Sequence, residues 1–397
     1  MSNINYYSKN NNMDNKNILL RLDLNVPIIK NVVKDSTRID LAIPFLKELS
    51  KLKSKIIIIS HLGRPNKLNR KELTLLPVFK YLKQVFNDKI TFHNGGIDQN
   101  LVNKINNMNN GSLILIENIR FFEGEEENDL SFSKRLANLG QVYINDAFSC
   151  SHRKQASVHG ITKFIKERYA GPQFKNEIKA IDSILINKKP PITCIIGGSK
   201  VSTKINVILN LMQYVDNIIL VGAMANNFHI QSGKKVGKSL LENNIKETVE
   251  KILSKFNKNK CKLYLPEDCS VSNSMEGEKK DKNFSNIDDN DIILDIGPQT
   301  IDRIKKMIDN SNTVLWNGPA GYFENINFAN GTNEIAKKIS ENSRTKSLIS
   351  ILGGGDTVNA INNIKEDLSF SHLSTAGGAF LDYLKGKDLP GVSVLKY

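Results

Sequence analysis

The feature that most restricts the fold of this chain is a repeated layout of β-branched runs, each followed by glycines or charged residues and then by a helix-like stretch. Most of the runs are continuously apolar, which is typical of parallel strands buried on both faces. Alternation of this kind over the whole length predicts an α/β protein with parallel sheets. The strand-like runs lie at 17–24, 55–60, 112–117, 141–145, 191–196, 217–222, 261–265, 291–296, 312–316 and 346–352. The helix-like stretches lie at 37–53, 75–86, 129–139, 204–214, 242–256, 299–309 and 332–342.

The chain is too long to form a single domain of this type with one core. Its 397 residues are enough for two domains, each with its own core. The break is expected at about 165–190, where a Gly-Pro turn, a helix-like run and a Pro-Pro pair precede the next strand. A connecting helix there would serve as a hinge. The polar, Asn-rich residues 1–17 lack the apolar segment of a secretory signal, and we expect them to form a partly disordered extension.

Composition narrows the function classes. The net charge is +14, but the lysines are scattered and no aromatic residues are interleaved with them, so nucleic-acid binding is not expected. Codon bias toward Lys and Asn is the favoured explanation, and attraction of small anionic substrates is the other. The four cysteines show no Cys-x-x-Cys spacing, which disfavours a disulfide framework or a zinc site and fits a cytoplasmic protein. No apolar run reaches 18 residues, so no membrane span is expected.

The first half of the chain places arginines and a histidine after its predicted strands, where ligands bind in open α/β sheets. Arginine presents a planar fork that suits phosphate and carboxylate oxygens, and gathered cations repel one another unless an anion binds. The alternative is that each arginine caps a helix or pairs with a nearby acid. Asp146 is interpreted as structural, for example by orienting an arginine. The candidates for binding an anion are Asp23, Asn25, Arg38, His61, Gly63, Arg64, Arg120 and Arg153.

The second half offers two glycine-rich loops after strands, "GGSK" from Gly197 and "GGGDT" from Gly353. Glycines let backbone N–H groups approach a phosphate, and a following helix start adds a positive dipole end. No Walker sequence occurs, so the chain would use a phosphate cradle of its own. Asp356 could hold Mg²⁺ on nucleotide phosphates, because magnesium takes one or two carboxylates plus phosphates. The alternative is that these segments are plain tight turns. The nucleotide-side candidates are Lys200, Lys204, Asn317, Glu324, Gly354, Gly355, Asp356 and Thr357.

These segments together resemble the phosphoglycerate kinase family, in order and over nearly the whole chain. The matching segments are "RLDLNVP", "SHLGRP", "ENIRF", "NDAF…SHR", "GGSKVSTK", "WNGPAGYFE", "GGGDT", "STAGGA" and "LPGVSVL". The resemblance implies two Rossmann-like domains with six-stranded parallel sheets flanked by helices, joined by a hinge helix across a cleft. The N-terminal domain would comprise 1–168 and about 383–397, and the C-terminal domain 169–382. The family usually works as a monomer. Departures from its pattern occur at Val221, Ala223 and Ala376 and in the hinge sequence.

The resemblance also implies roles for individual residues. The first-half candidates would bind 3-phosphoglycerate or 1,3-bisphosphoglycerate, and the second-half candidates would bind ADP or ATP with Mg²⁺. Arg38 and Lys200 would be the catalytic residues, balancing charge on the phosphoryl group in transfer. The reaction would be reversible phosphoryl transfer between 1,3-bisphosphoglycerate and ADP. A non-catalytic nucleotide- or anion-binding regulator on the same fold is the alternative. A dehydrogenase is disfavoured, because no G-x-G-x-x-G sequence follows a strand.

Overall fold

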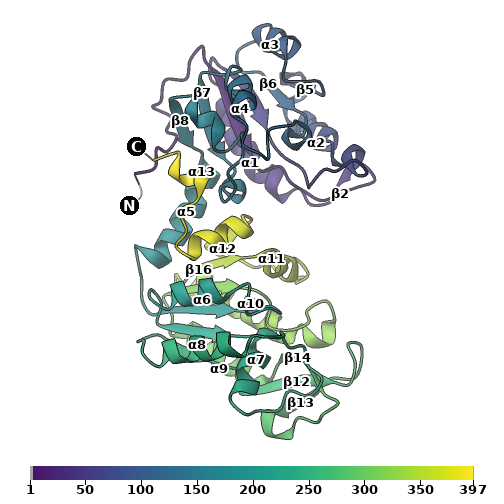
Figure 1. Ribbon diagram of the computed structural model, residues 1–397, viewed down its shortest axis with the longest axis vertical. Coiled ribbons are helices and arrows are strands. Elements are labelled where there is room, and N and C mark those ends of the chain that lie inside the picture. Colours follow the sequence, from purple (N-terminus) through teal and green to yellow (C-terminus); the bar gives the residue numbers. More distant parts are fainter. Residues whose placement is uncertain (1–2, 397) are drawn as a thin grey trace. The chain divides into compact units, whose positions relative to one another are not determined.

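The computed structural model describes residues 3–396 and divides the chain into two compact units. Unit 1 comprises Met1–Ile178 and Asp388–Tyr397, and unit 2 comprises Lys179–Lys387. Helix α5, Pro172–Leu185, passes from one unit into the other (Figure 1). No helix among the described residues is long and apolar enough to cross a membrane.

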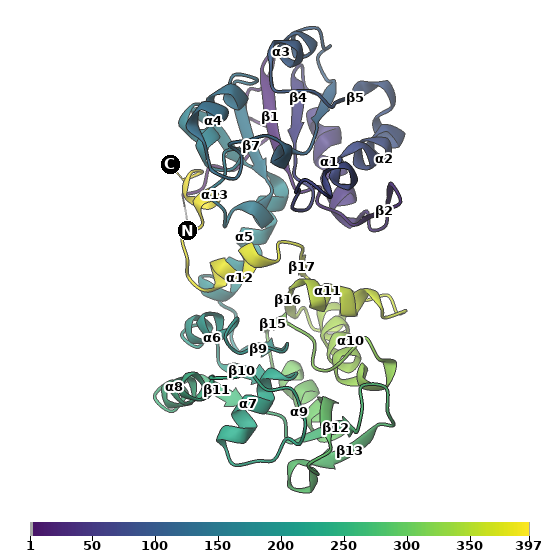
Figure 2. The same ribbon diagram turned by 45° about the vertical axis from the view of Figure 1, so that its right-hand side comes forward.

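Unit 1 is built on a six-stranded parallel sheet with the strand order β5-β6-β4-β1-β7-β8 (Figures 1 and 2). The core joins the apolar residues of β1 and β4 to the inner faces of α1 and α2. Strand β4 shows why the sequence folds this way, since its four isoleucines are all buried. The strands are β1 Asn17–Leu22, β4 Lys55–Ile59, β5 Ile90–His93, β6 Leu113–Ile116, β7 Val142–Asp146 and β8 Glu167–Ala170. The helices are α1 Thr37–Leu49, α2 Leu76–Phe86, α3 Gln99–Asn106, α4 Leu130–Ala137 and α13 Pro390–Ser393.

The unit is completed by a short hairpin and by 3₁₀ turns. The hairpin pairs β2, Ile28–Ile29, with β3, Val32–Val33, around two residues of positive φ. The 3₁₀ turns are η1 Arg70–Leu73, η2 Asn87–Lys89, η3 Ile119–Phe121, η4 Phe148–Cys150 and η5 Gly160–Lys163.

The expectation of a disordered N-terminal extension is wrong for residues 3–16. Ile4 pairs with Lys396, Tyr6 pairs with Ala170 of β8, and the side chain of Met13 is buried in the core. The backbone N–H of Asn5 also donates to the carbonyl of Leu395. The segment is ordered because its few apolar side chains find a sheet edge and the returning C-terminus, which composition alone does not reveal.

Unit 2 contains a second six-stranded parallel sheet, with the order β11-β10-β9-β15-β16-β17. Its strands are β9 Ile192–Ile196, β10 Asn217–Leu220, β11 Lys262–Tyr264, β15 Thr313–Asn317, β16 Ile349–Gly353 and β17 His372–Ser374. Its helices are α6 Ile205–Leu211, α7 Met224–Gln231, α8 Lys246–Phe256, α9 Pro298–Asp309, α10 Asn330–Thr345, α11 Gly355–Asn362 and α12 Gly378–Leu384, with 3₁₀ turns η6 Phe284–Asn286 and η7 Ile326–Phe328. Two parallel six-stranded sheets flanked by helices confirm the predicted fold class.

One predicted strand has a different partner from the one expected. The run 291–296 forms β14, Ile292–Ile296, in an antiparallel sheet with β12, Asp268–Ser272, and β13, Lys280–Asn283. The prediction of a parallel strand is wrong there, because a buried apolar run does not reveal strand direction. All the other predicted runs contain strands of the two parallel sheets. Helix α1 ends at Leu49 and α8 begins at Lys246, so both are shorter than predicted.

Candidate active site

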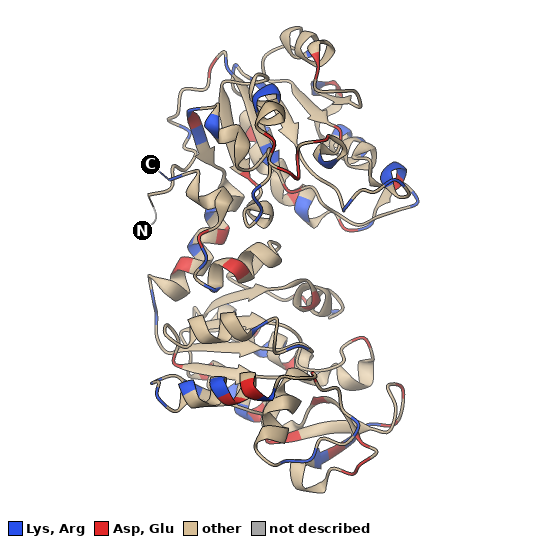
Figure 3. Cartoon of the chain, viewed as in Figure 1, with Lys and Arg blue, Asp and Glu red and all other residues tan. Residues whose placement is uncertain are grey.

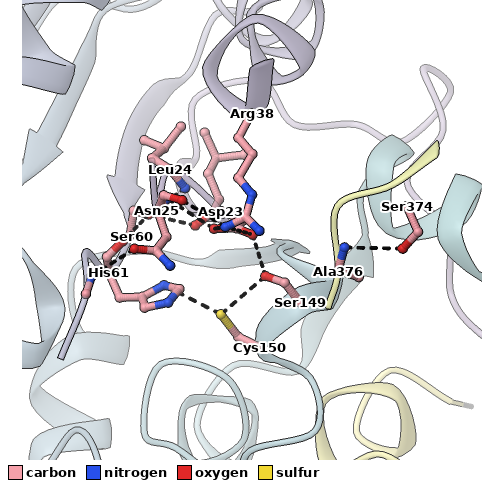
Figure 4. A network of polar contacts seen from close by, with 12 residues as sticks. Asp23, Leu24, Asn25, Arg38, Ser60, His61, Ser149, Cys150, Ser374 and Ala376 are labelled. Carbon is pink, nitrogen blue, oxygen red and sulfur yellow. Dashed lines mark hydrogen bonds and ion pairs between the residues drawn. The ribbon is translucent and has the colours of Figure 1, made fainter. Parts of the chain in front are cut away.

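The strand order of unit 1 brings four predicted loops together. Strands β6, β4, β1 and β7 are neighbours in the sheet, so the segments after their carboxyl ends meet at one edge. Asp23 and Asn25 follow β1, His61 to Arg64 follow β4, Arg120 lies in η3 after β6, and Arg153 follows β7. Arg38 joins them from the first turn of α1. Figure 4 shows the polar network that links part of this set.

Asp23 holds one side of the network in place. Arg38 Nη1 lies 3.1 Å from a carboxylate oxygen of Asp23 and donates to the carbonyl of Asn25 at 2.8 Å. Ser149 Oγ donates to the same carboxylate at 2.6 Å (Figure 4). The structure therefore assigns Asp23 to orienting Arg38.

Gly63 connects the other side of the network through its backbone. Its N–H donates to Asn25 Oδ1 at 2.8 Å, and its carbonyl accepts a hydrogen bond from Arg120 Nη1. Its φ of 57° suits glycine, and a Cβ there would lie 2.7 Å from the side chain of Leu73. Arg64, the next residue, has an exposed side chain at this edge. Arg153 Nε lies 3.2 Å from His152 Nε2.

His61 is buried beside several guanidinium groups. Burial, reinforced by the positive charges of Arg21, Arg120, Arg153 and Arg38, lowers the pKa of His61 well below its ordinary value. Arg21 Nη2 lies 3.3 Å from His61 Nδ1, and a guanidinium can only donate. Nδ1 is therefore the acceptor, and the proton of the neutral imidazole is at Nε2.

Arg120 is the least satisfied cation of the cluster. Its side chain is almost fully buried, yet Nε and Nη2 have no hydrogen-bond partner among the described residues. Nε lies 3.5 Å from an oxygen of the half-exposed Glu126 side chain. Burial, followed by the charge of Arg153, lowers the pKa of the Arg120 guanidinium. Buried donors of this kind are costly unless something accepts from them, so the arrangement suits an anion.

Asp146 is structural, as interpreted from the sequence, but it contacts the start of α5 and does not orient an arginine. Its Oδ1 accepts the backbone N–H of Phe174 at 2.9 Å in the first turn of α5. Burial raises the pKa of this carboxyl to about 7. Gly171 allows the contact, since a Cβ there would lie 2.5 Å from the carboxyl group. Asp146 therefore caps the helix that joins the two units.

In unit 2 the loops after β9, β15 and β16 lie together, since these strands are neighbours. Lys204 Nζ donates to Asn317 Oδ1, and Asn317 Nδ2 donates to the carbonyl of Gly353 at 2.5 Å. Thr357 Oγ1 accepts the N–H of Gly318 at 2.7 Å. Burial lowers the pKa of Lys204 to about 8, although the charge of Asp356 opposes this shift. These contacts assemble four of the predicted nucleotide-side residues around the start of α11.

Glycines at this edge of the sheet leave the backbone N–H groups accessible, because glycine has no side chain to cover them. Gly354 has a φ of 106° at the start of α11, and a Cβ built on Gly355 would meet nothing within 4 Å. Gly318 is required sterically, because a Cβ there would lie 2.3 Å from the carbonyl oxygen of Gly197. Asp356 and Lys200 have exposed side chains. Backbone N–H groups at a helix start, with space in front of them, suit phosphate oxygens.

A cavity of about 280 Å³ lies beside these loops. Gly198 and Asp356 line it on the loop side, and Glu324 lines it as well. Its remaining lining is mainly apolar and includes Leu294 and Phe284. Of the departures noted from the sequence, Ala223 lines the cavity, whereas Val221 and Ala376 are buried in the packing.

Strand-end reasoning missed several residues of both sites. Ser149 contributes to the unit 1 network but faces it from a 3₁₀ turn. His229 and Phe284 line the unit 2 cavity from α7 and η6. Only the unusual sequence "NDAFSCSHR", dense in polar residues after β7, could have pointed to Ser149.

The side chains near the start of α11 determine whether a magnesium ion fits there. Among residues 3–396, no group of three or more His, Cys, Asp or Glu side chains is placed to hold a metal ion. Asp356 is a single exposed carboxylate at the start of α11, beside the loops with open backbone N–H groups. One carboxylate fits a Mg²⁺ ion that takes its other ligands from phosphates and water.

Lysine and arginine are spread over both units and alternate with acidic residues in the view of Figure 3. This pattern agrees with the scattered lysines of the sequence. The local cation cluster around His61, and not the net charge, is the feature that points to an anionic ligand.

The chain is similar to known proteins over nearly its whole length. The family model described as phosphoglycerate kinase matches residues 8–387. A phosphoglycerate kinase of Wolbachia sp. subsp. Drosophila simulans is 43% identical over 390 residues, covering 98% of each chain. One from Chelativorans sp. is 39% identical, covering 96% of each. The solved phosphoglycerate kinase of Coxiella burnetii is 35% identical, with a TM-score of 0.88 over 98% of each chain. With the family matched over nearly its whole length, the chain belongs to the phosphoglycerate kinase family.

Proposed function

We propose that this chain performs its family's reaction with the phosphoglycerate in unit 1 and the nucleotide in unit 2. The reaction is reversible phosphoryl transfer between 1,3-bisphosphoglycerate and ADP, giving 3-phosphoglycerate and ATP, and it belongs to glycolysis. The observation that carries the assignment of unit 1 is the buried Arg120 guanidinium in a cluster of cations, since its Nε and Nη2 have no hydrogen-bond partner among the described residues. The alternative of a non-catalytic regulator has no support.

In unit 1, the anion would be bound by the guanidinium groups of Arg38, Arg64, Arg120 and Arg153. His61, neutral and protonated at Nε2, would donate a hydrogen bond without adding charge. Asp23 would keep Arg38 in position, and Asn25 would position the Gly63 loop through the hydrogen bond that it accepts. Charge-assisted hydrogen bonds from planar guanidinium groups favour phosphate and carboxylate oxygens over neutral groups.

In unit 2, phosphates would bind at the open start of α11, with Gly354, Gly355 and Thr357 forming the cradle. Lys204 and Asn317 hold that loop and would contact the phosphates. The base would occupy the apolar cavity and Glu324 the ribose hydroxyls, since Glu324 and Asp356 both line this space. Asp356 would hold Mg²⁺, which neutralises charge on phosphate oxygens when it is bound.

Chemistry requires no general base on the protein. The attacking group is an ADP phosphate oxygen or the carboxylate of 3-phosphoglycerate, and both are ionised at neutral pH. Lys200 and Arg38 would balance the charge on the phosphoryl group in transfer, with the backbone N–H groups of the α11 start. Reacting atoms must approach within about 3–3.5 Å, so the two ligands must meet. We propose that α5 is the hinge for this motion, and that the enzyme acts as a cytoplasmic monomer.

Turnover is tested by a coupled assay with ATP and 3-phosphoglycerate. The division between units is tested by calorimetry on two matched variants. Arg64→Ala should weaken 3-phosphoglycerate binding by about 10-fold or more, because a charge-assisted contact is lost, and should leave ADP affinity unchanged. Asp356→Ala should weaken the binding of ADP with Mg²⁺ and should leave the affinity for 3-phosphoglycerate unchanged. If each variant weakened both ligands equally, the assignment of one ligand to each unit would be wrong.

A further inference from the structure

The unit 2 cavity is lined by a buried polar side chain, His229, that has no hydrogen-bond partner among the described residues. His229 lies on α7 and lines the cavity, and only 1% of its surface is exposed. Neither of its ring nitrogens has a hydrogen-bond partner among the described residues. Buried polar groups are nearly always satisfied, because an unpaired donor or acceptor costs free energy. His229 is an exception to this rule, and it lines a cavity that a ligand could enter.

The surroundings of His229 keep its ring neutral and in one place. The imidazole packs on Phe284, with ring centroids 3.8 Å apart and an angle of 34° between the planes. Helix α7 lies beside the small β12–β14 sheet in both Figure 1 and Figure 2. Burial, followed by the charge of Lys234, lowers the pKa of His229 to about 3. A neutral imidazole carries one N–H donor and one acceptor nitrogen, and either nitrogen can take either part.

The contact with Phe284 also places His229 beside an apolar part of the cavity lining. Leu294 and Phe284 would contact the faces of a flat ring, but they cannot recognise polar atoms at its edge. His229 is a side chain that could do so. Its unpaired nitrogens and the polar edge of a purine are complementary.

We propose that His229 hydrogen-bonds the group at position 6 of the purine and so reads the base of the nucleotide. The inference rests on the proposed function, in which this cavity receives the base. The imidazole accepts from the 6-amino group of adenine. It donates to a 6-carbonyl when the proton is on the other nitrogen. The site therefore tolerates an amino group or a carbonyl and disfavours a purine with neither.

The test compares ADP with purine riboside 5′-diphosphate, which lacks the 6-amino group, by calorimetry with Mg²⁺. The intact protein should bind ADP about 10-fold more tightly, as one hydrogen bond in a buried site provides. His229→Leu should reduce this ratio to below about 2-fold, mainly by weakening ADP. His229→Asn, which keeps a donor and an acceptor, should retain part of the preference.

Leu240→Ala is the matched control. Leu240 lines the same cavity with an apolar side chain, so its truncation should change both affinities by one factor and leave their ratio intact. Equal affinities of the intact protein for the two nucleotides would overturn the inference, as would a His229→Leu variant that keeps the 10-fold ratio. Circular dichroism and urea unfolding report whether each variant is folded. Absence of turnover by the intact protein would instead refute the proposed function.

Discussion

Replacing Arg120 by methionine should separate ligand binding from stability. Methionine keeps much of the length and apolar body of the side chain but removes the charge and all five donors. Two of the guanidinium nitrogens, Nε and Nη2, have no hydrogen-bond partner among residues 3–396. Those two donors are the ones that we expect an anion to use.

The expected magnitudes follow from these contacts. Each charge-assisted hydrogen bond contributes about 1.5–3 kcal/mol, so losing two should weaken 3-phosphoglycerate binding by about 100-fold or more. Stability should change little, by about 1 kcal/mol in either direction. The lost bond from Nη1 to the Gly63 carbonyl costs about 1 kcal/mol, whereas removing a buried cation beside Arg153 and Arg21 relieves repulsion and desolvation.

Calorimetry measures the affinity for 3-phosphoglycerate, and urea unfolding in phosphate-free buffer measures the free energy of unfolding. Arg70→Met is the matched control, because the Arg70 guanidinium is exposed and lies over the ring of Phe121, next to Arg120 in the chain. It should leave affinity unchanged. A loss of more than about 3 kcal/mol of stability with unchanged affinity would refute the reasoning and make Arg120 a structural residue.

Two further predictions concern Lys200 and Asp146. Lys200→Ala should lower kcat by about 10²–10³-fold while changing both KM values by less than about 3-fold, because the exposed lysine is needed most when the phosphoryl group is in transfer; near-normal kcat at saturation would contradict a catalytic role. Asp146 has a folded-state pKa raised from 3.8 to about 7, so its contribution to stability is fully present below about pH 4 and is lost as pH rises through about 7. Asp146→Asn keeps the acceptor for Phe174 N–H but cannot ionise. Urea unfolding at several pH values should therefore show a smaller fall in the unfolding free energy of this variant between pH 4 and 7, by roughly 4 kcal/mol at most. Identical pH profiles of the variant and the intact protein would show that Asp146 does not titrate there.

The sequence alone determined the central strands of both parallel sheets and most of the candidate residues, but it did not indicate β5, β8, β12, β13 or β17. Strands such as β4 and β9 are recognisable because burial on both faces demands an unbroken apolar run, and that requirement is local. Loops such as Gly353 to Thr357 are recognisable because a tight, open backbone needs glycine. The resemblance to a family then supplied functional roles, which strand periodicity could not have provided.

Tertiary structure decided which of these residues meet. The strand order makes neighbours of loops that lie far apart in the chain, so that Gly63 joins Asn25 to Arg120. It also sets the direction of β14, which has the same apolar pattern as a parallel strand, and turns Asp146 toward α5. His229 shows the limit most clearly, because nothing in "MANNFHIQ" distinguishes a buried, unpaired imidazole from one in contact with solvent. The reason is physical: local spacing records whether a residue is buried, but its partners come from distant segments that only the packed chain brings together.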